Sequence, residues 1–111
     1  MTDAYVSSRL VEILHFDGCP NYAETVALVR RVARQLGVAP VIRTVRVQDA
    51  AAAAALRFLG SPTVRVDGHD VEPGAEQRHD FAFACRAYRN ASGYSGHPDE
   101  AWIRDALGVA T

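Results

Sequence analysis

The two cysteines of this 111-residue chain are the side chains best suited to covalent chemistry. Cys19 lies in the stretch HFDGCPNY (15–22), between an apolar run that ends at Asp17 and a helical pattern that begins after Pro20. A thiol at the start of a helix meets backbone N–H groups without intrahelical partners, and these groups favour the thiolate anion. Because the thiolate is the nucleophilic form of cysteine, Cys19 is the candidate catalytic residue.

Neighbouring residues decide which chemistry Cys19 can perform. The carboxylate of Asp17 disfavours a second negative charge nearby, and a protonated His15 would offset it. Tyr22 stands three positions after Cys19, where a second cysteine would be needed to resolve a mixed disulfide within the motif. The remaining possibilities are a mixed disulfide with an external thiol, oxidation sensing or attack on another electrophile. The alternative is that Cys19 is an inert turn residue.

Cys85 follows 66 positions later, in the apolar run FAFACRAYR (81–89). We expect it to lie in the core, because a buried free cysteine behaves as a small hydrophobic residue. The alternatives are a resolving thiol or a second soft-metal ligand that faces Cys19. Two cysteines are too few for a disulfide scaffold or a structural zinc site. We expect the nearby Arg86 and Arg89 to be solvated, the alternative being a site for an anionic group.

A polar segment precedes this run, between positions 69 and 80. Its histidines and carboxylates match no compact metal-binding pattern, so we interpret it as a surface loop and predict no metal site. The residues concerned are His69, Asp70, Glu72, His79 and Asp80, with His97 further along the chain.

Apolar periodicity predicts the elements that position these candidates. Branched and apolar residues indicate strands, a stripe at helical spacing that ends at Gly37 indicates the longest helix, and Asp49 is the expected cap of an alanine-rich helix. Pro20 suits the first position of the longest helix. The predicted strands span 10–16, 41–48, 63–66 and 81–89, and the predicted helices span 22–36, 49–58 and 98–108.

Composition and charge exclude several classes of protein. Apolar residues make up 49% and charged residues 23% of the chain, which is typical of one globular domain spanning residues 1–111. The net charge of -1 gives no electrostatic footprint for nucleic acid or an anionic membrane. No apolar stretch is long enough to span a membrane, and the first residues lack the apolar core of a secretory signal. We therefore expect a cytoplasmic protein.

The predicted order is β-α-β-α-β-β-α, with a mixed central sheet flanked by helices. This order resembles the thioredoxin-like superfamily, and three local features strengthen the resemblance. Cys19-Pro20-Asn21-Tyr22 is similar to the Cys-Pro-x-Cys motif of glutaredoxins with the second cysteine replaced. Ser61-Pro62-Thr63 stands where this family carries a cis-proline packed against the active cysteine, and Asp67-Gly68 stands at the turn after the third strand.

The wider pattern FDGCPN … GSPTVRVDG … ACRAYR … SGYSG … WIRDAL is similar to a group of small bacterial thioredoxin-like proteins, some of them labelled alkylmercury-lyase-like. The resemblance implies thiol–disulfide chemistry at Cys19, with a small thiol or a protein thiol or disulfide as partner and a low-molecular-weight thiol as co-substrate. It implies no other cofactor. The residues implied to shape the substrate site are Pro20, Asn21, Tyr22, Ser61, Pro62 and Thr63.

Two other functions stay open. One is a non-catalytic interaction module that pairs its proline loop or a strand edge with a partner segment. The other is binding of a soft metal or an organomercurial through Cys19 and Cys85. A disulfide between these cysteines requires Cα atoms within about 7 Å of each other. A residue of the fourth strand usually lies farther away in this fold, so we expect no such disulfide.

Overall fold

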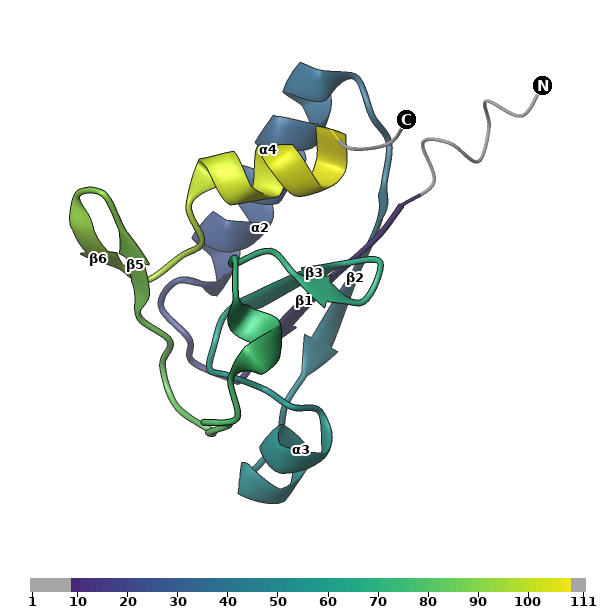
Figure 1. Cartoon of the computed structure of the whole chain (residues 1–111). Helices are drawn as coiled ribbons and strands as arrows, with labels where there is room; N and C mark the ends of the chain where they lie inside the picture. The colour runs from purple at the N-terminus through teal and green to yellow at the C-terminus, as the bar shows by residue number, and fades with distance from the viewer. Residues whose placement is uncertain (1–8, 109–111) are drawn as a thin grey trace.

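A four-stranded mixed sheet forms the centre of the protein, whose computed structural model describes residues 9–108 (Figure 1). The strand order is β2-β1-β3-β4, with β1 parallel to β2, and with β3 antiparallel to both β1 and β4. The predicted mixed α/β class is therefore confirmed. The expectation about the first residues of the chain falls on residues 1–8, outside the described part. The strands are β1 (Leu10–His15), β2 (Val41–Arg46), β3 (Thr63–Val66) and β4 (His69–Asp70).

In the described part of the chain, three α-helices accompany the sheet: α2 (Tyr22–Leu36), α3 (Ala50–Ala55) and α4 (Glu100–Gly108). Helices α2 and α4 pack against each other beside the sheet, whereas α3 lies apart at the other end of the molecule (Figure 1). Within residues 9–108, no helix combines the length and the apolar character that crossing a membrane requires.

Strand β1 contributes to the core on both of its faces. Successive strand side chains point to opposite faces, so Val11 and Ile13 join one buried cluster and Leu14 joins another. The larger cluster is completed by α2, α4 and β3, and the smaller one by Val47, Ala53 and Phe58. Because β1 is fixed on both faces, its C-terminal end at His15 is a firm support for the turn that follows.

The helix boundaries follow local signals, with three corrections, the first being that α4 begins at Glu100 and not at Pro98. Helix α2 spans the predicted residues and ends at Gly37, which takes the left-handed conformation at φ 71. It begins at Tyr22 with Asn21 as N-cap, so the prediction that Pro20 is its first residue is wrong. The Asp49 side chain caps α3 by accepting a hydrogen bond of 2.8 Å from the Ala52 N–H, as predicted. Helix α3 then ends at Ala55, earlier than expected.

The predicted strand at 81–89 is wrong over residues 81–87, and only Tyr88 and Arg89 lie in a strand. The fourth strand of the sheet is His69–Asp70, which follows the predicted turn at Asp67 and Gly68. A short 3-10 helix, η1 (Ala75–Gln77), comes next, and residues 81–87 then form an irregular segment that we name the strap. The chain continues into a separate hairpin, β5 (Tyr88–Asn90) and β6 (Gly93–Ser95), where a loop was expected.

Candidate functional site

Cys19 lies on the turn that connects β1 to α2, and its side chain is partly exposed. Its backbone N–H donates a hydrogen bond of 3.3 Å to the Phe16 carbonyl, and its own carbonyl accepts one of 3.4 Å from the Tyr22 N–H. The carbonyl of Asn21 accepts hydrogen bonds from both the N–H and the hydroxyl of Thr25, which fixes the first turn of α2. Cys19 is thus held two residues ahead of the helix N-cap.

The residues expected to influence the Cys19 thiol are engaged with other groups. The ring of His15 stacks on the ring of Tyr22, with centroids 3.8 Å apart and planes inclined by 24°. The carboxylate of Asp17 forms an exposed ion pair with Arg46 of β2 at 2.9 Å. The Asp17 charge that was expected to oppose a thiolate at Cys19 is therefore partly balanced by a guanidinium.

The amide of Asn21 packs on the loop that precedes α4. A Cβ atom placed on Gly96 would lie 2.2 Å from the Asn21 Nδ2 atom, so a larger residue at position 96 would require the Asn21 side chain to move. Of the three motif residues after Cys19, Pro20 is exposed, whereas Asn21 and Tyr22 are partly buried against Gly96 and His15.

The Ser61-Pro62 segment is tied to the Cys19 turn. The Phe16 N–H donates a hydrogen bond of 3.3 Å to the Ser61 Oγ atom, and the peptide bond between Ser61 and Pro62 is cis, as the family resemblance implied. Thr63 is fully buried, and its hydroxyl donates to the Gly60 carbonyl at 2.7 Å. The turn and the proline segment therefore meet at one end of the sheet.

The strap pairs with both backbone hydrogen-bonding groups of Ser61. The Ser61 N–H donates to the Ala84 carbonyl at 2.9 Å, and the Ser61 carbonyl accepts from the Arg86 N–H at 3.0 Å, which makes Cys85 the bridge partner of Ser61. The strap also contacts the Cys19 turn, because the rings of Phe16 and Phe83 lie 5.1 Å apart. The sheet-like pairing position beside Pro62 is thus filled by the chain itself.

The environment of Cys85 differs from the sequence prediction. We expected a core residue, but Cys85 is exposed. The strap crosses the surface of the molecule, and residues 82–85 all keep exposed side chains. A run of apolar and small residues is buried only if another helix or sheet packs against it, and no such element among residues 9–108 covers the Cys85 side chain.

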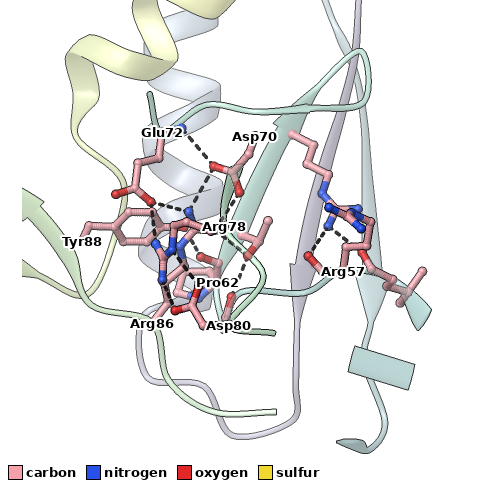
Figure 2. Close-up of polar contacts among 12 residues, drawn as sticks. Arg57, Pro62, Asp70, Glu72, Arg78, Asp80, Arg86 and Tyr88 are labelled. Atoms are coloured by element: carbon pink, nitrogen blue, oxygen red, sulfur yellow. Dashed lines mark hydrogen bonds and ion pairs between the residues drawn. The ribbon is translucent and has the colours of Figure 1, made fainter. Parts of the chain in front are cut away.

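Arg86 is buried, with 4% of its surface exposed, although we expected it to be solvated. Its guanidinium donates to Asp70 at 2.8 and 3.1 Å, to Glu72 at 2.6 Å and to the Thr63 hydroxyl at 2.9 Å (Figure 2). Burial alone would lower the pKa of Arg86, but the oxygen of Tyr88 and the two carboxylates outweigh burial and raise it. The positive charge that anchors the strap is therefore permanent.

Further contacts complete this buried cluster. The Tyr88 hydroxyl donates a hydrogen bond to the Pro62 carbonyl, and its ring lies 4.3 Å from the Arg86 guanidinium carbon. Arg78 pairs with Glu72 at 3.3 Å and with Asp80 at 2.7 Å, and Asp80 has its pKa lowered to about 2 mainly by that hydrogen bond (Figure 2). Part of the predicted surface loop thus forms an ion-pair network that supports the proline segment. An arginine flanked by apolar and small residues, downstream of several carboxylates, is the sequence signal for this network.

A separate cavity of about 320 Å³ opens beside α3, with Arg57 held 4.8 Å over the ring of Phe81 on its wall. Arg65, from the same wall, donates to the carbonyls of Leu56 and Arg57. Neither cysteine lines this cavity. Among residues 9–108, no three histidine, cysteine or carboxylate side chains are grouped so that they could hold a metal ion.

The two cysteines, the proline segment and the buried arginine therefore gather around Ser61 and Phe16. The chain matches no protein-family model, and neither a curated protein nor a solved structure matches it.

Proposed function

We propose that this protein is a thioredoxin-like thiol–disulfide exchange protein that acts through Cys19. The observation that carries the proposal is the placement of a partly exposed cysteine on the β1–α2 turn, with Phe16 of that turn hydrogen-bonded to Ser61 beside Pro62. The strand order and directions support the same assignment, because a parallel first pair is followed by an antiparallel third and fourth strand. The proposed partner is a small thiol or a protein thiol or disulfide.

In the proposed reaction, the Cys19 thiolate attacks one sulfur of a disulfide substrate. A new bond forms to the Cys19 sulfur, the substrate disulfide breaks, and the released thiolate takes up a proton. The rings of His15 and Tyr22 are stacked where the turn leaves β1 and enters α2, and Arg46 balances the charge of Asp17. An external thiol can then release the bound group, a reaction that suits the reducing conditions of a cytoplasm.

The test uses the Cys85→Ser variant, in which Cys19 is the only thiol. The reduced variant is mixed with bis(2-hydroxyethyl) disulfide at pH 7, and mass spectrometry follows the adduct with time. We expect the folded protein to form the Cys19 adduct at least ~10-fold faster than the same protein unfolded in urea, because the folded turn holds the thiol in a fixed position for attack. Equal rates in the two states would refute the proposal. Cys19→Ser in the same background is the control that shows no adduct.

A second candidate, an interaction module, is favoured by the outer edge of β2. In the described sheet, β2 pairs only with β1, and Val41 at its start has 60% of its surface exposed. An open edge can accept a strand from a partner, whereas the backbone of Ser61 is already occupied by the strap. If Cys19 reacts at equal rates in the folded and the unfolded protein, the interaction module at the β2 edge becomes the favoured function.

A further inference from the structure

We propose that Cys85 is the second thiol of this redox site: it attacks the mixed disulfide at Cys19 and forms an intramolecular disulfide with it. This inference rests on the function proposed above and specifies how the mixed disulfide is resolved. The position three residues after Cys19 holds Tyr22, whose ring is stacked on His15, so the resolving thiol must come from another part of the chain or from another molecule.

A short series of hydrogen bonds connects the two cysteines. Cys85 is the bridge partner of Ser61, the Ser61 hydroxyl oxygen accepts from the Phe16 N–H at 3.3 Å, and the Phe16 carbonyl accepts from the Cys19 N–H at 3.3 Å. Only Ser61 and Phe16 stand between the two cysteines in this series. The β1–α2 turn and the strap run side by side along the same end of the sheet in both views (Figures 1 and 2).

Packing on both sides of Cys85 keeps it at this place. The Phe83 ring contacts the Phe16 ring at 5.1 Å, and on the other side the buried Arg86 is fixed by Asp70 and Glu72. The strap is therefore anchored at two points that flank Cys85. A thiol held in this way meets the turn far more often than one on an unattached loop, which raises its effective concentration at Cys19.

Both thiols are also accessible. Cys85 is exposed, Cys19 is partly exposed, and the neighbours of Cys85 in the strap include the exposed small residues Ala84 and Ala87. A disulfide requires Cα atoms within about 7 Å of each other. Because residues 82–85 all have exposed side chains, no core side chain in the described part of the chain covers the Cys85 thiol.

The complete reaction consumes one external disulfide. The Cys19 thiolate first attacks the external disulfide, forms the mixed disulfide and releases one external thiolate. The Cys85 thiolate then attacks the Cys19 sulfur, the bond from Cys19 to the external group breaks, and a second external thiolate leaves. The two protein thiols lose two electrons, the external disulfide gains them, and the two thiol protons pass to the two released thiolates.

The experiment compares the wild-type chain with Cys85→Ser after brief treatment with bis(2-hydroxyethyl) disulfide. We expect the Cys85→Ser protein to accumulate a lasting Cys19 adduct. In the wild type the adduct should disappear at least ~10-fold faster and give a monomer lighter than the reduced protein by two hydrogen atoms, because the resolving thiol is held beside it. Tryptic peptides that contain Cys19 and Cys85 should then be joined until a reductant is added.

A positional control uses the same strap. The double variant Ala82→Cys with Cys85→Ser carries an exposed thiol three residues earlier, where the Ala82 N–H is bonded to the Phe58 carbonyl rather than to Ser61. We expect this thiol to resolve the adduct at least ~10-fold more slowly than Cys85 does. Equal persistence of the Cys19 adduct in the wild type and in Cys85→Ser would overturn the inference while leaving the proposed function intact. Absence of any Cys19 adduct in both proteins would overturn both.

Discussion

At the scale of single residues, Arg86 determines the geometry of the candidate site. Its guanidinium donates hydrogen bonds to both carboxylate oxygens of Asp70 and to one of Glu72, and its backbone N–H donates to the Ser61 carbonyl. Removal of one partner from a buried ion pair leaves the other charge without compensation, and this is costly even when the pair itself adds little net stability. Arg86 therefore connects the strap to the proline segment through both its backbone and its side chain.

We predict that Arg86→Met lowers the free energy of unfolding by about 3 kcal/mol, because Asp70 and Glu72 lose their buried counterion. Urea denaturation followed by circular dichroism measures the change. The matched control is Arg89→Met, since Arg89 is exposed and should change stability by less than about 0.5 kcal/mol. Adding Asp70→Asn and Glu72→Gln to Arg86→Met should restore part of the loss. Equal effects of Arg86→Met and Arg89→Met would disprove the anchoring role.

At the scale of elements, the strap takes the place of an additional strand beside the proline segment. It is attached by two backbone hydrogen bonds to Ser61 and by the close approach of Gly60. A Cβ atom on Gly60 would lie 2.8 Å from the Arg86 Cβ atom and 3.1 Å from the Ala84 carbonyl oxygen. With φ at 126, Gly60 also has a conformation that other residues rarely adopt.

Gly60→Ala should therefore separate the strap from Ser61. We expect the free energy of unfolding to fall by about 2 kcal/mol more than in Gly93→Ala, whose φ of 120 imposes similar backbone strain but whose added methyl group meets nothing within 4 Å. Hydrogen exchange provides the second measurement. Exchange at the Ser61 and Arg86 amides should speed up in Gly60→Ala and stay unchanged in Gly93→Ala, and a uniform change across the chain would count against a local effect.

At the scale of the whole molecule, Tyr88 couples global stability to alkaline pH. It is fully buried below Pro62, and burial is the main cause that raises its pKa above the ordinary value. The folded protein therefore favours the neutral phenol. This contribution to stability is present in full below pH ~10, where the unfolded chain begins to release the proton, and is lost as the pH rises further.

We predict that the wild type loses stability above pH ~10 by up to about 1.4 kcal/mol per pH unit more than Tyr88→Phe does. At pH 7 the variant should be less stable by about 1 kcal/mol, because the Pro62 carbonyl loses its hydrogen bond. Urea denaturation at a series of pH values measures both effects. Tyr94→Phe is the control, since Tyr94 is 74% exposed and its loss should leave the pH profile of the wild type unchanged. Parallel profiles for the wild type and Tyr88→Phe would contradict this assignment.

Local patterns in the sequence were sufficient to predict most elements of the fold up to the turn at Asp67. The apolar stripe from Tyr22 with a glycine at position 37, the capping aspartate at position 49 and the turn at Asp67 all depend on interactions between near neighbours in the chain. The position of Cys19 between a strand and a helix follows from the same patterns. These features are local, so the sequence by itself determined them.

The second half depended on competition for strand edges, which only the tertiary structure decided. The run at 81–89 has the composition of a strand, but the two-residue turn after Val66 brings His69–Asp70 to the free edge of β3 first. Closing so short a loop costs less entropy than closing a longer one, so the later run becomes the strap. Cys85 is exposed and Arg86 is buried as a result. The surroundings of both strap residues are set by contacts with residues that are distant in the sequence, and local patterns do not reveal such contacts.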